Sequence, residues 1–151
     1  MNTDLPIPPA ERVNPKTDPP RIRPERLAKV AMVGGRGLIA LLFVVAGVVK
    51  VLGPQPFLDH MSQAGVPTFL LPAVIALELG AGLALMIGWR VRDAAGALGI
   101  FCLMTATIFH HQIEINAERT SFFKDLAIAG GLLAMAASAS ASLRKNKGEA
   151  V

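Results

Sequence analysis

The sequence predicts an all-α integral membrane protein, folded as a bundle of four transmembrane helices. Three observations lead to this fold class. Four long apolar segments follow one another along the 151 residues, of which 52% are hydrophobic. These segments lack the charged stripe at helical spacing that a surface helix of a soluble protein carries. The Lys and Arg residues gather on alternate connections between the segments, as the positive-inside rule requires.

Residues 1–33 are predicted to form a disordered cytoplasmic tail rich in Pro and Arg. This stretch contains seven of the eleven prolines, counted as Pro6, Pro8, Pro9, Pro15, Pro19, Pro20 and Pro24. Its composition is too polar to bury the apolar surface that folding needs. The tail is also too long for the basic region of a signal peptide, and its acidic residues argue against an organellar transit peptide. We therefore expect a bacterial inner-membrane protein.

The first two helices are predicted over residues 34–52 and 68–89. A spanning helix needs about 17–25 residues. The first apolar run, residues 37–52, is short, so we extend it to residue 34 and expect Arg36 to snorkel to the interface. The second run is long enough without extension, and Trp89 at its end is expected to anchor the helix at the interface.

The remaining two helices are predicted over residues 94–111 and 122–143, so that residues 34–143 form one membrane domain. Residues 144–151 then form a basic cytoplasmic tail. The alternative is a soluble bundle of very apolar helices. It would have to bury every side of residues 126–143, which contain no charged residue.

The positive charges predict that both termini lie in the cytoplasm. With this orientation, twelve of the fifteen Lys and Arg residues fall on the inner side: Arg12, Lys16, Arg21, Arg23, Arg26, Lys29, Arg36, Arg90, Arg92, Arg144, Lys145 and Lys147. The outer side holds Lys50, Arg119 and Lys124. This asymmetry accounts for the net charge of +4, so no nucleic-acid partner is expected.

Rows of small residues predict close contacts between helices, because lipid provides no hydrophobic drive for helix association. The second helix carries Ala76, Gly80, Ala84 and Gly88; the third carries Ala95 and Gly99; the fourth carries Gly130, Ala134, Ser138 and Ser142. The same rows could serve a homo-oligomer, and both alternatives stay open.

The ionisable residues of the bundle are expected to form one polar layer on its outer half, which is the candidate ligand site. Its members are Lys50, Glu78, His110, Lys124 and Asp125. Glu78 is the deepest, at about 15 Å inside the outer boundary by the rise of a helix. An acid at this depth is costly and marks a functional or pairing site by default.

Each member of the layer also has a purely structural interpretation. Glu78 is either ionised and paired with Lys50 or Lys124, or protonated and hydrogen-bonded across helices. The two lysines can snorkel, Asp125 suits the first turn of a helix, and His110 can be an interfacial polar residue. His60 is expected to be a solvated loop residue, and Cys102 a small apolar core residue.

No metal site or covalently bound cofactor is expected. The neighbouring residues His110 and His111 would point about 100° apart on a helix. No motif for a phosphate, a dinucleotide or a catalytic serine is present. We therefore expect no catalytic activity from this chain on its own, and the catalytic residues stay unknown.

An ordered set of motifs resembles the DoxX family of small bacterial membrane proteins. In chain order the matching stretches are "RGLIALLFVVAGVVKVLGPQPF", "QAGVP", "IALELGAGLALMIGWRVRDAAGAL", "FH" at 109–110 and "FFKDLAIAGGLLA". They resemble the family's Arg…Gly-x-x-Lys first helix, its Glu in helix two, its Arg turn, the His that ends helix three and the Phe-x-Lys that opens helix four. The family often has Lys-Asn where this chain has Lys124-Asp125.

The resemblance implies a four-helix membrane fold and a link to redox systems. We therefore expect a membrane subunit or partner of a quinone- or thiol-linked redox enzyme, with a quinone as its ligand. A non-catalytic scaffold or assembly factor is the alternative, and a small proton-coupled transporter is a third interpretation.

Overall fold

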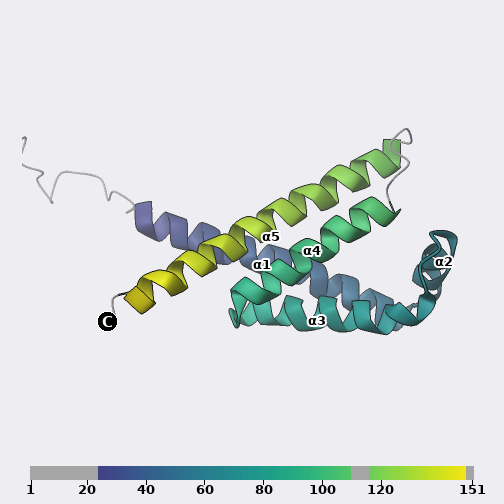
Figure 1. The fold of residues 1–151 in the computed structure, drawn as a ribbon, viewed down its shortest axis with the longest axis horizontal. Coiled ribbons are helices and arrows are strands. Elements are labelled where there is room, and N and C mark those ends of the chain that lie inside the picture. Colours follow the sequence, from purple (N-terminus) through teal and green to yellow (C-terminus); the bar gives the residue numbers. More distant parts are fainter. Residues whose placement is uncertain (1–23, 110–115, 149–151) are drawn as a thin grey trace, which may run out of the picture.

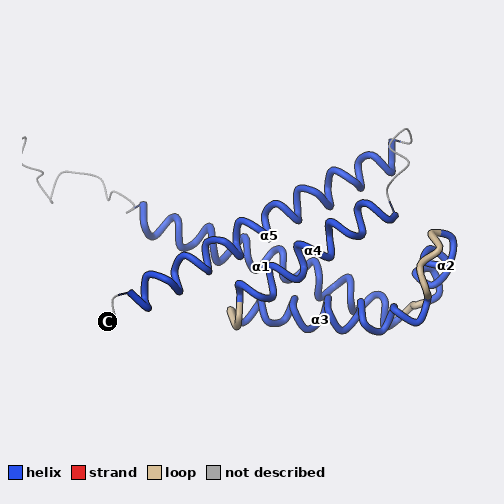
Figure 2. The backbone as a smooth tube through the Cα atoms, in the orientation of Figure 1, coloured by secondary structure: helices blue, strands red, loops and turns tan. Residues whose placement is uncertain are grey.

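The computed structural model describes residues 24–109 and 116–148, and for residues 116–118 and 145–147 it describes the backbone alone. Within these ranges the chain is almost entirely helical, and no strand occurs in them (Figure 2). In chain order the elements are α1 (Pro24–Leu52), α2 (Gln55–Gln63), the 3₁₀ turn η1 (Thr68–Leu70), α3 (Leu71–Ile87), α4 (Val91–Phe109) and α5 (Asn116–Gly148).

Within the described residues, four helical stretches are long and apolar enough to cross a membrane. They are Pro24–Leu52, Thr68–Ile87, Val91–Phe109 and Arg119–Arg144. Large apolar side chains on them point away from the protein; Leu38, for example, is 72% exposed and Ile87 is 75% exposed. Such a surface suits hydrocarbon and is costly in water. The predicted fold class is therefore confirmed, while the inward orientation of both termini stays a prediction.

Helix α1 begins at Pro24 rather than at residue 34. Residues 24–33 are thus helical, although they were predicted to belong to the disordered tail; residues 1–23 lie outside the described residues. Pro24 is well suited to open a helix, because its missing N–H is unpaired there in any case. The residues after it, "ERLAKVAM", are mostly strong helix formers, and averaging them with the preceding prolines concealed this tendency.

The other helices differ from their predicted bounds mainly at their ends. Helix α3 ends at Ile87, because Gly88 takes a left-handed conformation with φ 80°. Helix α5 extends from Asn116 to Gly148 and is longer than predicted. The short helix α2 was not predicted at all; its first turn carries a proline and it buries Met61.

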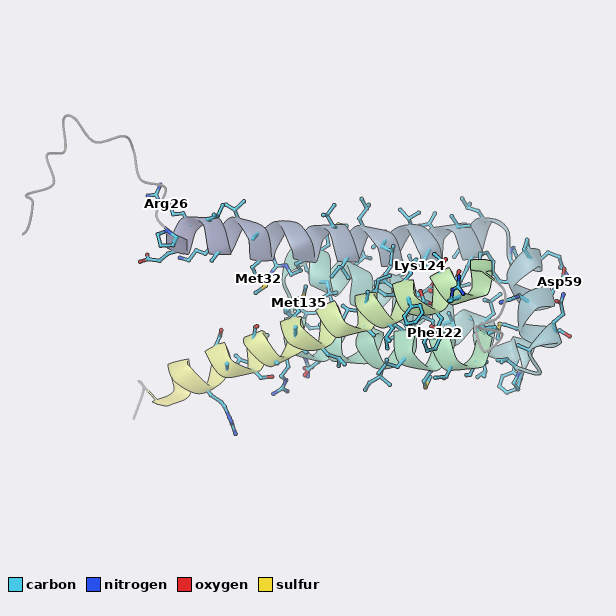
Figure 3. The ribbon with its side chains drawn as sticks, turned by 90° about the horizontal axis from the view of Figure 1, so that it is seen from above. Arg26, Met32, Asp59, Phe122, Lys124 and Met135 are labelled. Atoms are coloured by element: carbon cyan, nitrogen blue, oxygen red, sulfur yellow. The ribbon has the colours of Figure 1, made fainter. Side chains whose placement is uncertain are left out.

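The helices pack as two pairs, α1 with α3 and α4 with α5, and a smaller contact joins α3 to α4. Figure 1 shows that α3 and α4 meet at their common turn and diverge toward the end of the molecule where α2 lies. Figure 3 labels Asp59 of α2 and Lys124 of α5 at that same end, with Arg26 at the far end of α1. The shared core is built from Ala40, Phe43, Ala84, Leu85, Ala94, Ala95, Leu98, Cys102, Ala129, Leu132 and Met135.

Glycines set the closest helix approaches, but not all of them are the predicted ones. A Cβ at Gly47 would lie 2.7 Å from Leu79 Cγ, and one at Gly82 would lie 3.1 Å from Val44 Cγ2. These two glycines therefore bring α1 and α3 together. Between α4 and α5, a Cβ at Gly99 would lie 3.2 Å from Leu133 Cδ2.

Two of the predicted small-residue rows are partly wrong as contacts within the bundle. Nothing lies within 4 Å of a Cβ at Gly80 or Gly130, and Ala76, Ala134 and Ser138 are exposed. Ala84 of the α3 row is buried in the core as predicted, and on α5 the core residues are Ala129, Leu132 and Met135 rather than the row. The Ala95 and Gly99 contact is confirmed.

Candidate functional site

Lys50 and Glu78 form a buried ion pair that joins α1 to α3. The Lys50 ammonium donates to both Glu78 carboxylate oxygens, each at 2.8 Å. The side chains of Lys50 and Glu78 are 14% and 4% exposed. Of the two states considered for Glu78, this geometry corresponds to the ionised, paired one, with Lys50 rather than Lys124 as the partner. Two charges that are removed from water in this way are tolerated only when each is paired with the other and hydrogen-bonded to it.

The local sequence explains how Lys50 reaches Glu78. Gly47 lies one helical turn before Lys50, and its lack of a side chain lets Leu79 of α3 pack directly against α1. The two helices therefore approach closely next to the ion pair. The Lys50 ammonium also lies 4.9 Å from the centre of the Phe57 ring of α2, a distance at which a ring attracts a cation.

The ion pair forms part of the wall of a cavity of about 530 Å³, called here the Lys50–Glu78 cavity. All the helices contribute to it, and most of its lining is apolar, with Phe43, Phe101, Met104 and Ile108 among the larger side chains. Its lining includes Leu71, Val74 and Glu78 of α3 and several residues of α4 between 101 and 109. A cavity of this size with few polar groups is typical of a small-molecule site.

Two further predicted residues line the same cavity from α5. The Lys124 ammonium lies 3.9 Å from an Asp125 carboxylate oxygen, with side-chain exposures of 60% and 18%. The structure thus brings together four of the five candidate residues: Lys50, Glu78, Lys124 and Asp125. The fifth, His110, lies outside the described residues.

The sequence did not indicate two side chains of this cavity. His60 was expected to be a solvated loop residue, but it lies on α2, lines the cavity and stacks on Phe109 with ring centres 4.9 Å apart. Cys102 is buried as predicted, and it also lines the cavity. Recognition of α2 as a helix would have been needed to place His60.

This arrangement offers hydrogen-bond donors and acceptors at a few points of an otherwise apolar surface. It suits a molecule with a flat or flexible apolar body and a small polar head. Within the part of the chain that the structure describes, no three His, Cys, Asp or Glu side chains gather as a metal ion would need.

The family can be assigned from sequence comparison. The sequence model of the DoxX family matches residues 31–111, more than half of the chain. The chain belongs to the DoxX family. The matched region contains both Lys50 and Glu78, whereas Lys124 and Asp125 follow it.

Two relatives place this DoxX protein in the bacterial inner membrane. The chain is 38% identical over 112 residues to "Inner membrane protein YqjF" of Escherichia coli (strain K12). That alignment covers 74% of this chain and 86% of that protein. The chain is 28% identical over 114 residues to "Inner membrane protein YphA" of the same organism. That alignment covers 71% of this chain and 81% of that protein. No solved structure matches the chain. Together with the four apolar spans, these names identify a multi-pass inner-membrane protein.

Proposed function

We propose that this DoxX-family protein binds a quinone in the Lys50–Glu78 cavity and acts as a membrane subunit or partner of a redox enzyme. The chain itself would carry no electrons. Its role would be to hold the quinone, or its reduced form, within reach of an enzyme that does.

One observation carries this proposal: charged groups capable of both donating and accepting hydrogen bonds lie in the wall of an apolar cavity of about 530 Å³. An ammonium has three N–H donors and no acceptor. Lys50 and Lys124 can therefore donate to a quinone carbonyl oxygen. Glu78 and Asp125 can accept from the hydroxyl groups of the reduced form. The apolar lining would receive the ring substituents and the isoprenoid chain.

The test is equilibrium binding of a short-chain benzoquinone to the purified protein in mild detergent. We expect saturable binding, because the cavity combines charged groups with an apolar lining. The double variant Lys50→Met/Glu78→Leu should lose binding. Asp59→Asn is the matched control, since Asp59 is exposed on α2 and bonded to Gln55. Binding that survives in the folded double variant would contradict the site assignment.

A non-catalytic scaffold is the second candidate, favoured by the ion pair itself. Lys50 and Glu78 satisfy each other and tie α1 to α3, which is sufficient reason for a bundle to retain them. In that case the folded double variant would still associate with its protein partners, and the wild type would show no saturable quinone binding. Identification of proteins that co-purify with both forms separates the two functions.

A further inference from the structure

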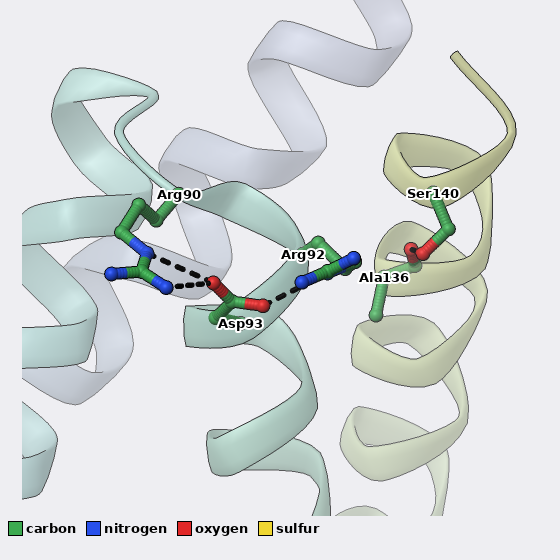
Figure 4. A network of polar contacts seen from close by, with 5 residues as sticks. All are labelled: Arg90, Arg92, Asp93, Ala136 and Ser140. Atoms are coloured by element: carbon green, nitrogen blue, oxygen red, sulfur yellow. Dashed lines mark hydrogen bonds and ion pairs between the residues drawn. The ribbon is translucent and has the colours of Figure 1, made fainter. Parts of the chain in front are cut away.

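The turn between α3 and α4 carries a second charged cluster, at the end of the bundle opposite α2. Arg90 and Arg92 flank one carboxylate, that of Asp93 (Figure 4). Arg90 places its Nε 2.9 Å and its Nη2 2.8 Å from Asp93 Oδ2, and Arg92 Nε lies 2.9 Å from Oδ1. Each guanidinium has five N–H donors, so these contacts use a minority of the donors in the pair.

The backbone of this turn is held in an uncommon conformation. Gly88 has φ 80° and Arg90 has φ 45°. Within the described residues, Arg90 is the one non-glycine residue with positive φ, a conformation that is unfavourable for a residue with a Cβ. Strained backbone of this kind often accompanies binding sites. Here it presents both arginines on the outside of the turn.

Beside the arginines lies a second cavity of about 500 Å³, called here the turn cavity. Arg90, Arg92 and Asp93 supply its charged side, and Ser142 of α5 adds a hydroxyl group. Val91, Ala139 and Leu143 supply an apolar side. The lining therefore combines positive charge with apolar surface, and it lies between two packed helices.

The position of the turn cavity along the spans indicates which molecule reaches it. One span ends at Ile87 and the next begins at Val91, so the turn lies where hydrocarbon gives way to lipid headgroups. Trp89 between them is 61% exposed, as is typical of an interfacial indole. Arg36 of α1 adds a further cation, because its guanidinium packs against Gly88.

We propose that the turn cavity binds the phosphate headgroup of an anionic phospholipid such as phosphatidylglycerol. Arg90 and Arg92 donate to the phosphate oxygens, and Val91, Ala139 and Leu143 contact the glycerol backbone and the upper part of the acyl chains. Basic pockets between transmembrane helices are known to select such headgroups. Asp93 competes with the phosphate for the same guanidinium groups, so it keeps the affinity moderate. None of its residues lines the Lys50–Glu78 cavity, so the proposal does not rest on the function proposed for that cavity.

The test uses Trp89, the chain's one tryptophan. The full-length protein in nonionic detergent is titrated with phosphatidylglycerol, with phosphatidylcholine and with inorganic phosphate while the fluorescence is recorded. We expect a saturating change with phosphatidylglycerol alone. A similar change with phosphatidylcholine would show that the headgroup charge is irrelevant, and one with inorganic phosphate would make this a free-anion site. Either result overturns the proposal.

Three variants sharpen the test. Arg90→Gln/Arg92→Gln should weaken phosphatidylglycerol binding by about tenfold or more, since each basic residue near a membrane surface contributes about 1 kcal/mol of attraction. Arg26→Gln/Lys29→Gln removes the same charge from an exposed part of α1 and should leave binding nearly unchanged. Asp93→Asn should strengthen binding, because it releases both guanidinium groups.

The Asp93→Asn variant also separates this role from a structural one. If Asp93 serves mainly to hold the turn, its loss should disturb the turn and weaken lipid binding. Weaker binding in Asp93→Asn, or unchanged binding in the folded Arg90→Gln/Arg92→Gln variant, would overturn the proposal.

Discussion

At Glu78 a carboxylate lies in apolar surroundings with both of its oxygens bonded to Lys50. Moving either charge out of water costs several kcal/mol, and within hydrocarbon no water replaces a lost partner. The pair is tolerated because each charge satisfies the other and the Phe57 ring lies against the ammonium. The stability of the region therefore depends on both residues together.

This dependence predicts a double-mutant result. Glu78→Gln alone should destabilise the protein by about 3–5 kcal/mol, because it leaves the Lys50 charge buried without its partner. Lys50→Met/Glu78→Leu should recover most of that loss. Thermal unfolding in detergent, followed by circular dichroism, measures both effects. Lys124→Gln, which alters a largely exposed side chain, is the control. A double variant no more stable than Glu78→Gln would contradict this account.

The thiol of Cys102 should react slowly in the folded protein. Cys102 is 5% exposed, and a buried thiol in apolar surroundings is held in its unreactive form. We expect maleimide labelling to be slow in mild detergent and fast after unfolding in sodium dodecyl sulfate. Quantitative labelling within minutes in the folded state would show that the cavity is open to solvent in this region.

The sequence indicated which single residues are unusual but not how they pair. Glu78 stands out because an acid deep in an apolar helix is rare. Lys50 and Lys124 were equally good partners, since the choice depends on how α1 and α3 are rotated and offset. The Gly47 and Leu79 contact decides this, and no periodicity within one helix reveals a contact with another.

Among the helices, α1 and α3 depend on glycine more than the other pair of packed helices does. Gly47 and Gly82 both lie at this contact. Neither belongs to the four-residue row that was predicted on α3. Of that row, Ala84 lies in the core beside Leu85, whereas Ala76 and Gly80 are exposed, so the row follows the packed face only in part.

Gly47→Ala and Gly80→Ala should therefore behave differently. At Gly47 the new methyl would lie 2.7 Å from Leu79 Cγ, so Leu79 must move, and overpacking of this kind costs about 1–3 kcal/mol. At Gly80 nothing lies within 4 Å, and stability should stay the same or rise slightly. Thermal unfolding of the two variants in one detergent makes the comparison; equal losses would contradict the assigned contact.

For the molecule as a whole, the fold class followed from the four apolar segments, and the distribution of the Lys and Arg residues agreed with it. A chain in lipid has to satisfy its backbone internally, which restricts an apolar run of about 20 residues to a helix. The pairing of α1 with α3 and of α4 with α5 could not be predicted, because it depends on contacts between helices. The cavity was equally hidden, since its lining is assembled from residues of all five α-helices.

The orientation of the whole molecule can be tested directly. With twelve of its fifteen basic residues on one side, the chain should keep both termini in the cytoplasm. A green fluorescent protein fused after residue 151 should fluoresce, and alkaline phosphatase inserted after Asp59 of α2 should be active outside. The controls exchange the reporters: alkaline phosphatase fused after residue 151 and green fluorescent protein inserted after Asp59 should both be inactive. An active phosphatase at the C-terminus would contradict the predicted orientation.

Helix α4 contributes to the walls of both cavities, with Arg92 at one end and Cys102 and Phe109 farther along. It packs against α5 and so connects the two cavities. If an occupant of one cavity alters the affinity of the other, the second must alter the first by the same factor. The phospholipid content of the membrane would then act as an effector of quinone affinity, and the quinone pool would in turn bias which lipids surround the protein.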